Sequence, residues 1–171
     1  MNATISEKMI TQATAREATG ENAKPADVIV RGKASGFLQD ITSGKHHSQA
    51  DEPASVGGTD AAPTPYDYLL AGLGACTSMT VGMYARRKKW ALDEVTVALK
   101  HSRIHATDCE DCETKAGMLD HIEIDVKLTG DLTDEQRAKL MEIAGKCPVH
   151  RTLKSEIKIQ VRPAADAGTA G

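Results

Sequence analysis

One stretch of this chain, residues 64–88, carries the signals of a long helix and limits what the rest can form around it. Thr64 suits the position just before a helix, Pro65 suits its first turn, and Asp67 places a negative charge near the positive end of the helix dipole. Four consecutive cations, residues 86–89, suit the opposite end. The sequence therefore predicts a helix that begins at Pro65 and runs to about Lys88.

The middle of this predicted helix has unusually little side-chain bulk. Gly72, Gly74 and Ala75 follow one another closely, and each glycine costs roughly 1 kcal/mol of helix stability relative to alanine. Such a cost is tolerated where another element must approach the backbone closely. We therefore expect a second element to pack tightly against the middle of this helix.

The segments on either side of the helix have the pattern of strands. Before it, residues 28–30, 37–41 and the segment around 45–47 are separated by glycines, which is typical of a meander of short antiparallel strands. After it, apolar and polar residues alternate over 95–99 and 122–128, which predicts two half-buried strands joined by a polar loop.

The end of the chain predicts one more helix and one more strand. Thr133 and Gln136 have the spacing of a capping box, and the helix they open turns Leu140 toward the core and ends at the pair Cys147-Pro148. Alternation over 157–161 predicts a last strand. The order of strands and helices predicts an α+β fold.

Composition limits the size, location and partners of this domain. The chain has 171 residues, 40% of them hydrophobic, and a formal charge of −3, which indicates one domain and gives no reason to expect nucleic acid as a partner. No apolar run is long enough to cross a membrane and the N-terminus lacks a secretory signal pattern, so we expect a cytoplasmic location, no membrane partner and no cofactor. We expect a single domain over 25–162, a disordered tail over 1–24 and a flexible tail over 163–171.

Two cysteines stand in settings that suggest thiol chemistry. Cys76 lies among small apolar residues of the long helix, whereas Cys147 precedes a proline and is followed by the cations His150 and Arg151. A cysteine in such a helix can also be an ordinary packed hydrophobic residue. The pair is separated by 70 intervening residues, so only the fold can bring the two sulfurs together.

Three segments together resemble the OsmC/Ohr family of peroxide-resistance proteins, in its less characterised OsmC-like branch. They are the run from Pro63 to Thr77, the segment 128–137, and the closing run from Cys147 to Leu153. The resemblance covers roughly residues 26–161. It implies an antiparallel sheet with long central helices, an intertwined homodimer with sites formed between subunits, and reduction of organic hydroperoxides by a thiol-dependent peroxidase with a role in oxidative stress defence.

The resemblance also assigns roles to the two cysteines. Cys76 corresponds to the nucleophile that becomes a sulfenic acid, and Cys147 to the resolving thiol, with a lipoyl group or a small thiol as reductant. Better-known members have a glutamate where this chain has Tyr66, and their early arginine has no clear counterpart. The residues that support Cys76 in their place are expected among Arg31, Tyr66, Asp67, His150 and Arg151.

A second cysteine motif lies in the polar loop between the two later strands. Cys109 and Cys112 form a C-x-x-C pair, and with histidines nearby they could supply zinc ligands. Acidic neighbours would attract a cation but would also raise the pKa of both thiols. Three interpretations of this motif remain: an exposed loop without a special role, an accessory redox pair, or a metal site. The metal site would use His101, His105 and His121 as further ligands.

Three classes of function remain. The first is the thiol peroxidase. The second is a non-catalytic redox-sensing module or a protein that binds a hydrophobic small molecule. The third is a Cys-His acyl-transfer enzyme built on Cys147 and His150, which lacks the glycine-flanked turn that usually exposes such a nucleophile.

Overall fold

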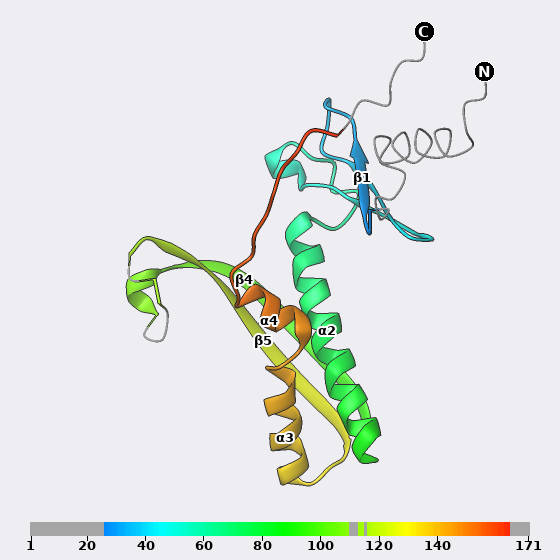
Figure 1. The fold of residues 1–171 in the computed structure, drawn as a ribbon, viewed down its shortest axis with the longest axis vertical. Coiled ribbons are helices and arrows are strands. Elements are labelled where there is room, and N and C mark those ends of the chain that lie inside the picture. The colour runs from blue at the N-terminus through cyan, green and yellow to red at the C-terminus, as the bar shows by residue number, and fades with distance from the viewer. Residues whose placement is uncertain (1–25, 110–112, 115, 165–171) are drawn as a thin grey trace, which may run out of the picture. The chain divides into compact units, whose positions relative to one another are not determined.

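The computed structural model describes residues 26–109, 113–114 and 116–164, and they have an α+β architecture (Figure 1). The chain divides into two compact units at the step from Thr64 to Pro65. The expected single domain over 25–162 stays a prediction. The tail 1–24 and most of the tail 163–171 lie outside the described residues. Within the described residues, no helix combines the length and the hydropathy that a membrane crossing requires.

The N-terminal unit contains the predicted meander of three antiparallel strands. They are β1 (Ile29–Gly32), β2 (Gln39–Ser43) and β3 (His46–Ala50), in the order β1-β2-β3, followed by the short 3-10 helix η1 (Ala54–Val56). Gly44 occupies the tight turn between β2 and β3 with φ of 57°, a conformation that favours glycine.

A buried carboxylate holds the loop that follows β3. Asp51 is 1% exposed, and its Oδ2 accepts hydrogen bonds from the hydroxyl of Thr59 at 2.6 Å and from the N–H groups of Thr59 and Ala61 at 3.0 and 3.1 Å. These bonds, the one from the Thr59 hydroxyl above all, lower the pKa of Asp51 to about 2. One charged side chain thus ties together the two ends of the loop that precedes the long helix.

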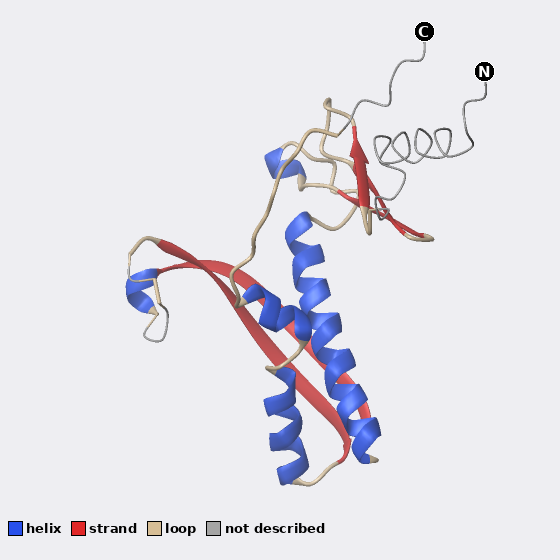
Figure 2. Ribbon diagram, viewed as in Figure 1, coloured by secondary structure: helices blue, strands red, loops and turns tan. Residues whose placement is uncertain are grey.

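The C-terminal unit is built around the helix that the sequence predicts. Helix α2 (Pro65–Lys88) has its predicted bounds and packs against β4, α3 and α4 (Figure 2). The two strands that follow are longer than predicted and pair antiparallel with each other. The remaining elements are β4 (Ala91–His105), the 3-10 helix η2 (Ala106–Asp108), β5 (Met118–Asp131), α3 (Asp134–Ala144) and α4 (Pro148–Leu153).

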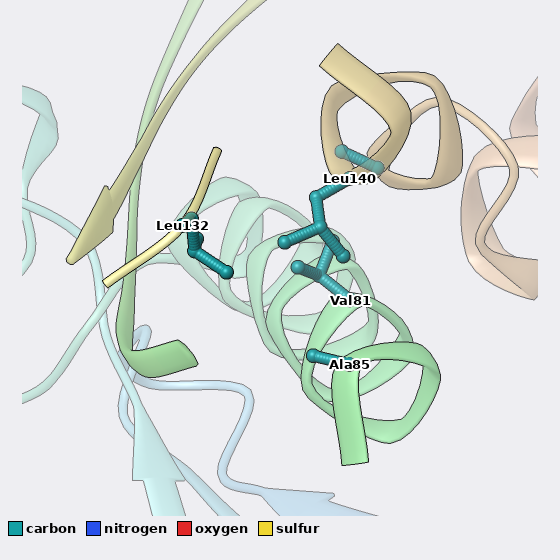
Figure 3. Close-up of a cluster of buried hydrophobic side chains, with 5 residues drawn as sticks. Val81, Ala85, Leu132 and Leu140 are labelled. Carbon is teal, nitrogen blue, oxygen red and sulfur yellow. The ribbon is translucent and has the colours of Figure 1, made fainter. Parts of the chain in front are cut away.

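A compact apolar cluster joins α2 to α3. Leu140 and Val81 are fully buried, and with Ala85, Leu132 and Ala144 they form the core of this unit (Figure 3). Helix α3 begins with the predicted capping box, in which Thr133 and Gln136 exchange hydrogen bonds between side chain and backbone. The capping box fixes the residue at which α3 begins, and this determines the face of the helix on which Leu140 lies.

The close approach expected at the middle of α2 is confirmed at one of its glycines. A Cβ on Gly74 would lie 2.7 Å from Cδ1 of Leu99 on β4, so a larger residue there would push the helix and the strand apart. A Cβ on Gly72 would meet no atom of the described residues within 4 Å. Gly74 therefore serves the packing of this chain, whereas Gly72 leaves a flat, open patch on α2.

The prediction of a last strand over 157–161 is wrong for this chain. These residues belong to no strand of the described structure, and Ile159 and Val161 are 81% and 95% exposed. Alternating apolar residues favour a strand only where another strand offers free backbone groups. Within the described residues, β4 and β5 pair with each other, and 157–161 pairs with no strand.

Candidate active site: two thiols between α2 and α4

Cys147 lies at the start of a helix, which corrects the prediction that the preceding helix ends on it. Helix α3 already ends at Ala144, and Cys147 caps α4 with φ of −64° and ψ of 150°, while Pro148 occupies the first helical turn. Proline pushes the residue before it into extended backbone and is itself well suited to a first turn. The same dipeptide therefore opens a helix here.

The sulfur of Cys147 is buried among hydrogen-bond donors. Cys147 is 0% exposed, and its Sγ accepts from Oγ1 of Thr77 at 3.4 Å and from the backbone N–H of His150 at 3.3 Å. Burial raises the pKa of the Cys147 thiol, but the hydrogen bonds from Thr77, His150, the Cys76 side chain and the Val149 N–H outweigh it, and the pKa lies below its ordinary value. The site favours a thiolate at Cys147.

The structure brings the two predicted cysteines to one site. Thr77, the neighbour of Cys76 on α2, donates to the Cys147 sulfur at 3.4 Å, the Cys76 side chain contributes to the lowered pKa of Cys147, and both cysteines are free of disulfide bonds. Cys76 is partly exposed and opens onto a cavity of about 330 Å³. The other residues that line this cavity are Gly72, Ala75, Met79, Thr80, Met83 and Pro148. The Cys76 sulfur is therefore accessible to a small molecule, whereas the Cys147 sulfur is buried.

A second, smaller cavity is lined in part by Thr77 and His150, the two residues that donate to Cys147. It has a volume of about 190 Å³ and is largely apolar. Its lining comprises Thr77, Ile124, Val126, Met141, Ala144, Gly145 and His150. Thr77 and His150 thus separate the buried sulfur from an apolar space next to β5.

The supporting residues expected from the sequence are only partly gathered at this site. His150 contacts Cys147, but through its backbone N–H. Arg151 is exposed on α4 and lines an open cavity of about 620 Å³ together with His150. Arg31 lies exposed on β1, in the N-terminal unit.

The two residues expected at the start of the long helix have other surroundings. Tyr66 stacks on the ring of His101 with centroids 4.7 Å apart, and Asp67 lies in the first turn of α2. Tyr66 is ten residues before Cys76, which is about 15 Å along a helix. Tyr66 therefore contacts β4 through His101 and lies away from the two cysteines.

Sequence reasoning missed Thr77, which supplies the only side-chain hydroxyl bond to Cys147 found among the described residues. Thr77 follows Cys76 directly and is 0% exposed. A polar residue next to a cysteine in an apolar helix is a weak signal, because its partner belongs to a distant part of the sequence. The contact becomes visible only once α4 is packed against α2.

The loop with the C-x-x-C motif offers no complete metal site in the part of the chain that the structure describes. There, no three His, Cys, Asp or Glu side chains gather in a way that could hold a metal ion. Cys109 is disulfide-bonded, and His101 pairs with Asp120 at 3.0 Å. Cys112 lies outside the described residues, so the metal hypothesis for Cys109, Cys112, His105 and His121 stays a prediction.

Comparison with known proteins agrees with this architecture. Solved structures with the same fold include an OsmC-like protein from Mycoplasma pneumoniae, at 20% identity and TM-score 0.58, covering 77% of this chain and 88% of that one. An organic hydroperoxide resistance protein from Elizabethkingia anophelis matches at 20% identity and TM-score 0.57, covering 81% and 94% of the two chains. The organic hydroperoxide resistance protein OhrB of Bacillus subtilis matches at 23% identity and TM-score 0.52, covering 77% and 91%.

The sequence itself matches a family model over most of its length. No curated protein matches this chain. The model of the OsmC-like proteins matches residues 58–162, which include every element from α2 to α4 and both free cysteines. The chain belongs to the OsmC-like protein family.

Proposed function

We propose that this protein is a thiol-dependent peroxidase that reduces organic hydroperoxides and serves in oxidative stress defence. The observation that carries the proposal is the placing of two free cysteines at one site, where Thr77, next to Cys76 on α2, donates to the sulfur of Cys147 at 3.4 Å. Two neighbouring free thiols can supply both electrons for the reduction of a peroxide, because the second thiol resolves the sulfenic acid formed on the first. Organic hydroperoxide resistance proteins from other organisms share the fold.

The reaction divides into two steps. Cys76 attacks the distal oxygen of the hydroperoxide, the O–O bond breaks, the alcohol leaves, and the sulfur becomes a sulfenic acid. Cys147 then attacks this sulfur, water leaves, and a disulfide forms between the two residues. The two thiols supply both electrons, and a thiol reductant such as a lipoyl group or a small thiol returns the disulfide to the starting state.

Accessibility decides which sulfur reacts first. Cys76 is partly exposed and lines the cavity of about 330 Å³, whereas Cys147 has no exposed surface. Methionine and small apolar side chains line the same cavity and suit an organic group better than a charged one. We therefore assign Cys76 as the nucleophile and Cys147 as the resolving thiol, with Arg151 as the cation that stabilises the negative charge.

We further propose that the protein acts as a homodimer through one face of α2. Leu69, Gly72, Cys76, Met79 and Met83, called here the α2 stripe, follow one another at steps of three and four residues and so share one side of the helix. Leu69, Met79 and Met83 are 39%, 71% and 59% exposed. A continuous apolar stripe of this kind is what a second copy of α2 would cover.

The dimer proposal is tested by charging the α2 stripe. Replacing Met79 and Met83 together by glutamate is expected to halve the molecular mass measured by light scattering, because two like charges would face their counterparts across the interface. Met141→Glu is the matched control, since Met141 is also an exposed methionine but lies on α3. A wild-type protein that is already monomeric at micromolar concentration would contradict the proposal.

The peroxidase proposal is tested by counting thiols. An organic hydroperoxide added in one equivalent is expected to remove two free thiols per chain and to leave a disulfide between Cys76 and Cys147 that peptide mass spectrometry identifies. Unchanged thiols would reject the peroxidase. Saturable binding of a hydrophobic ligand without thiol loss would instead favour a binding module, and ester turnover would favour acyl transfer.

A further inference from the structure

We propose that the open cavity beside α4 is an anion site that receives the reductant of the cycle, a small thiol that carries a carboxylate. The inference rests on the proposed function and names the chemical class of its reductant. It is carried by the basic side chains that line the cavity, by their lack of acidic partners among the described residues, and by the residue that this cavity shares with the cavity of Cys76.

The lining of this cavity is basic and polar. The cavity has a volume of about 620 Å³, and the described residues that line it include three basic side chains and two hydroxyl groups but no carboxylate. The basic residues are His150, Arg151 and Lys154. Residues three and four positions apart are neighbours on a helix surface, so Lys154, which caps the end of α4, lies beside both of the others.

The charges of Arg151 and Lys154 are not compensated within the described part of the chain, where neither residue forms an ion pair. The nearby carboxylates have other partners. Asp120, which lines an adjacent cavity with Lys154, pairs with His101 at 3.0 Å, and Glu142 of α3 pairs with two lysines close to it in the sequence. Arg151 and Lys154 can therefore hold a carboxylate by charge-assisted hydrogen bonds.

The basic cavity adjoins the cavity of Cys76. Pro148 lines both cavities, so they meet at this residue. Their linings differ, because methionine and small side chains surround Cys76, whereas basic and hydroxyl side chains surround the larger cavity. A small molecule whose carboxylate lies in the larger cavity can present its other end past Pro148 to Cys76.

The positive charge suits the reductant of the cycle better than the hydroperoxide. The reacting form of a thiol is the thiolate, which is an anion, whereas an organic hydroperoxide is neutral near neutral pH. Positive side chains raise the local concentration of anions and favour the ionised form of a thiol. A carboxylate on the reductant strengthens the same attraction.

Reduction of the disulfide takes two molecules of the thiol. The first thiolate attacks Sγ of Cys76, the bond to Cys147 breaks, and Cys147 leaves as a thiolate that accepts hydrogen bonds from the Thr77 hydroxyl and the His150 N–H. A second thiolate attacks the reductant sulfur bound to Cys76, and Cys76 leaves as a thiolate while a disulfide of two reductant molecules departs. Each reductant molecule gives up one electron, and its proton returns to a cysteine through solvent.

The test compares 3-mercaptopropionate with 3-mercaptopropionamide, which differ in charge but hardly in size. The disulfide between Cys76 and Cys147 is formed with diamide, so no hydroperoxide is needed, and the return of free thiols is timed. Rates are expressed per thiolate and relative to a small-molecule disulfide. The wild type should favour the anionic thiol by roughly tenfold at low salt. This preference should be largely lost at about 1 M salt, where charges are screened within about 3 Å.

Variants of Lys154 locate the effect. Lys154→Gln should lower the preference for the anionic thiol by about threefold, and Lys154→Arg should retain it. Lys127→Gln is the matched control, because it removes the same charge from an exposed lysine of β5 that does not line the cavity. Equal rates for the two thiols in the wild type, or equal losses in Lys154→Gln and Lys127→Gln, would overturn the anion site.

Further outcomes separate the site from the cycle. If Lys154→Gln slowed oxidation by a hydroperoxide that carries a carboxylate but left both thiols unaffected, the assignment to the reductant would be wrong. A preference for the anionic thiol in the diamide-oxidised protein, together with unchanged thiols after an organic hydroperoxide is added, would overturn the proposed function and leave the anion site in place. Failure of diamide to join Cys76 and Cys147 would overturn both.

Discussion

Replacing Cys76 by serine is expected to lower the rate of hydroperoxide consumption by roughly a thousandfold or more. A serine hydroxyl does not ionise near neutral pH, and its oxygen cannot form the sulfenic acid on which the cycle depends. The fold should survive, because Cys76 is partly exposed and the substitution changes one atom. The measurement is steady-state loss of an organic hydroperoxide, with circular dichroism as the check on folding.

Cys147→Ser is the informative comparison for this variant. It retains the nucleophile but lacks the resolving thiol, so one equivalent of hydroperoxide is consumed and a sulfenic acid accumulates on Cys76. A dimedone adduct at Cys76 would detect it. Turnover that persists in Cys76→Ser would show that the chemistry belongs to another residue.

Replacing Leu140 by alanine is expected to lower the free energy of unfolding by about 2–5 kcal/mol. Leu140 has no exposed surface and fills the space between Val81, Leu132 and the small residue Ala85 (Figure 3). Alanine would remove the apolar contacts of the side chain and leave a cavity that the helices α2 and α3 can close only in part. Urea unfolding followed by circular dichroism gives the difference in free energy directly.

Met141→Ala is the matched control for Leu140→Ala, because Met141 is the next residue of α3 and is 45% exposed. The control should change the free energy of unfolding by about 0.5 kcal/mol or less. Equal effects of the two substitutions would contradict the position of the core between α2 and α3.

The elements with local signals were predictable from the sequence. Helix α2 has its predicted bounds because Pro65 and the cations at its end act on the helix itself, whatever packs against it. The capping box of Thr133 likewise depends on residues three positions apart. Apolar and polar residues alternate clearly in the middle of β4 and β5, but both strands extend beyond these residues. Pairing between the two strands stabilises the end residues, whose own sequence pattern is weak.

The elements that depend on a distant partner were not predictable in the same way. Residues 157–161 alternate like a strand, yet in this chain they pair with none. Cys147-Pro148 was interpreted as a helix stop, although proline serves equally at a first turn, and only the chain that follows decides between the two. Tyr66 was expected among the residues that support Cys76, and only the folded chain shows that its ring stacks on His101.

The sequence alone predicted the resemblance to the family, the long helix and the two cysteines of interest. These features depend on periodicity, capping residues and short motifs, all of which involve residues close together in the sequence. Only the tertiary structure decided that Cys76 and Cys147 come to one site, that Thr77 and the His150 N–H donate to the buried Cys147 sulfur, and that Cys76 lines a cavity. The physical reason is that a hydrogen bond between residues 70 positions apart depends on how α4 packs against α2, and the donors that lower the pKa of Cys147 reach its sulfur only after that packing exists.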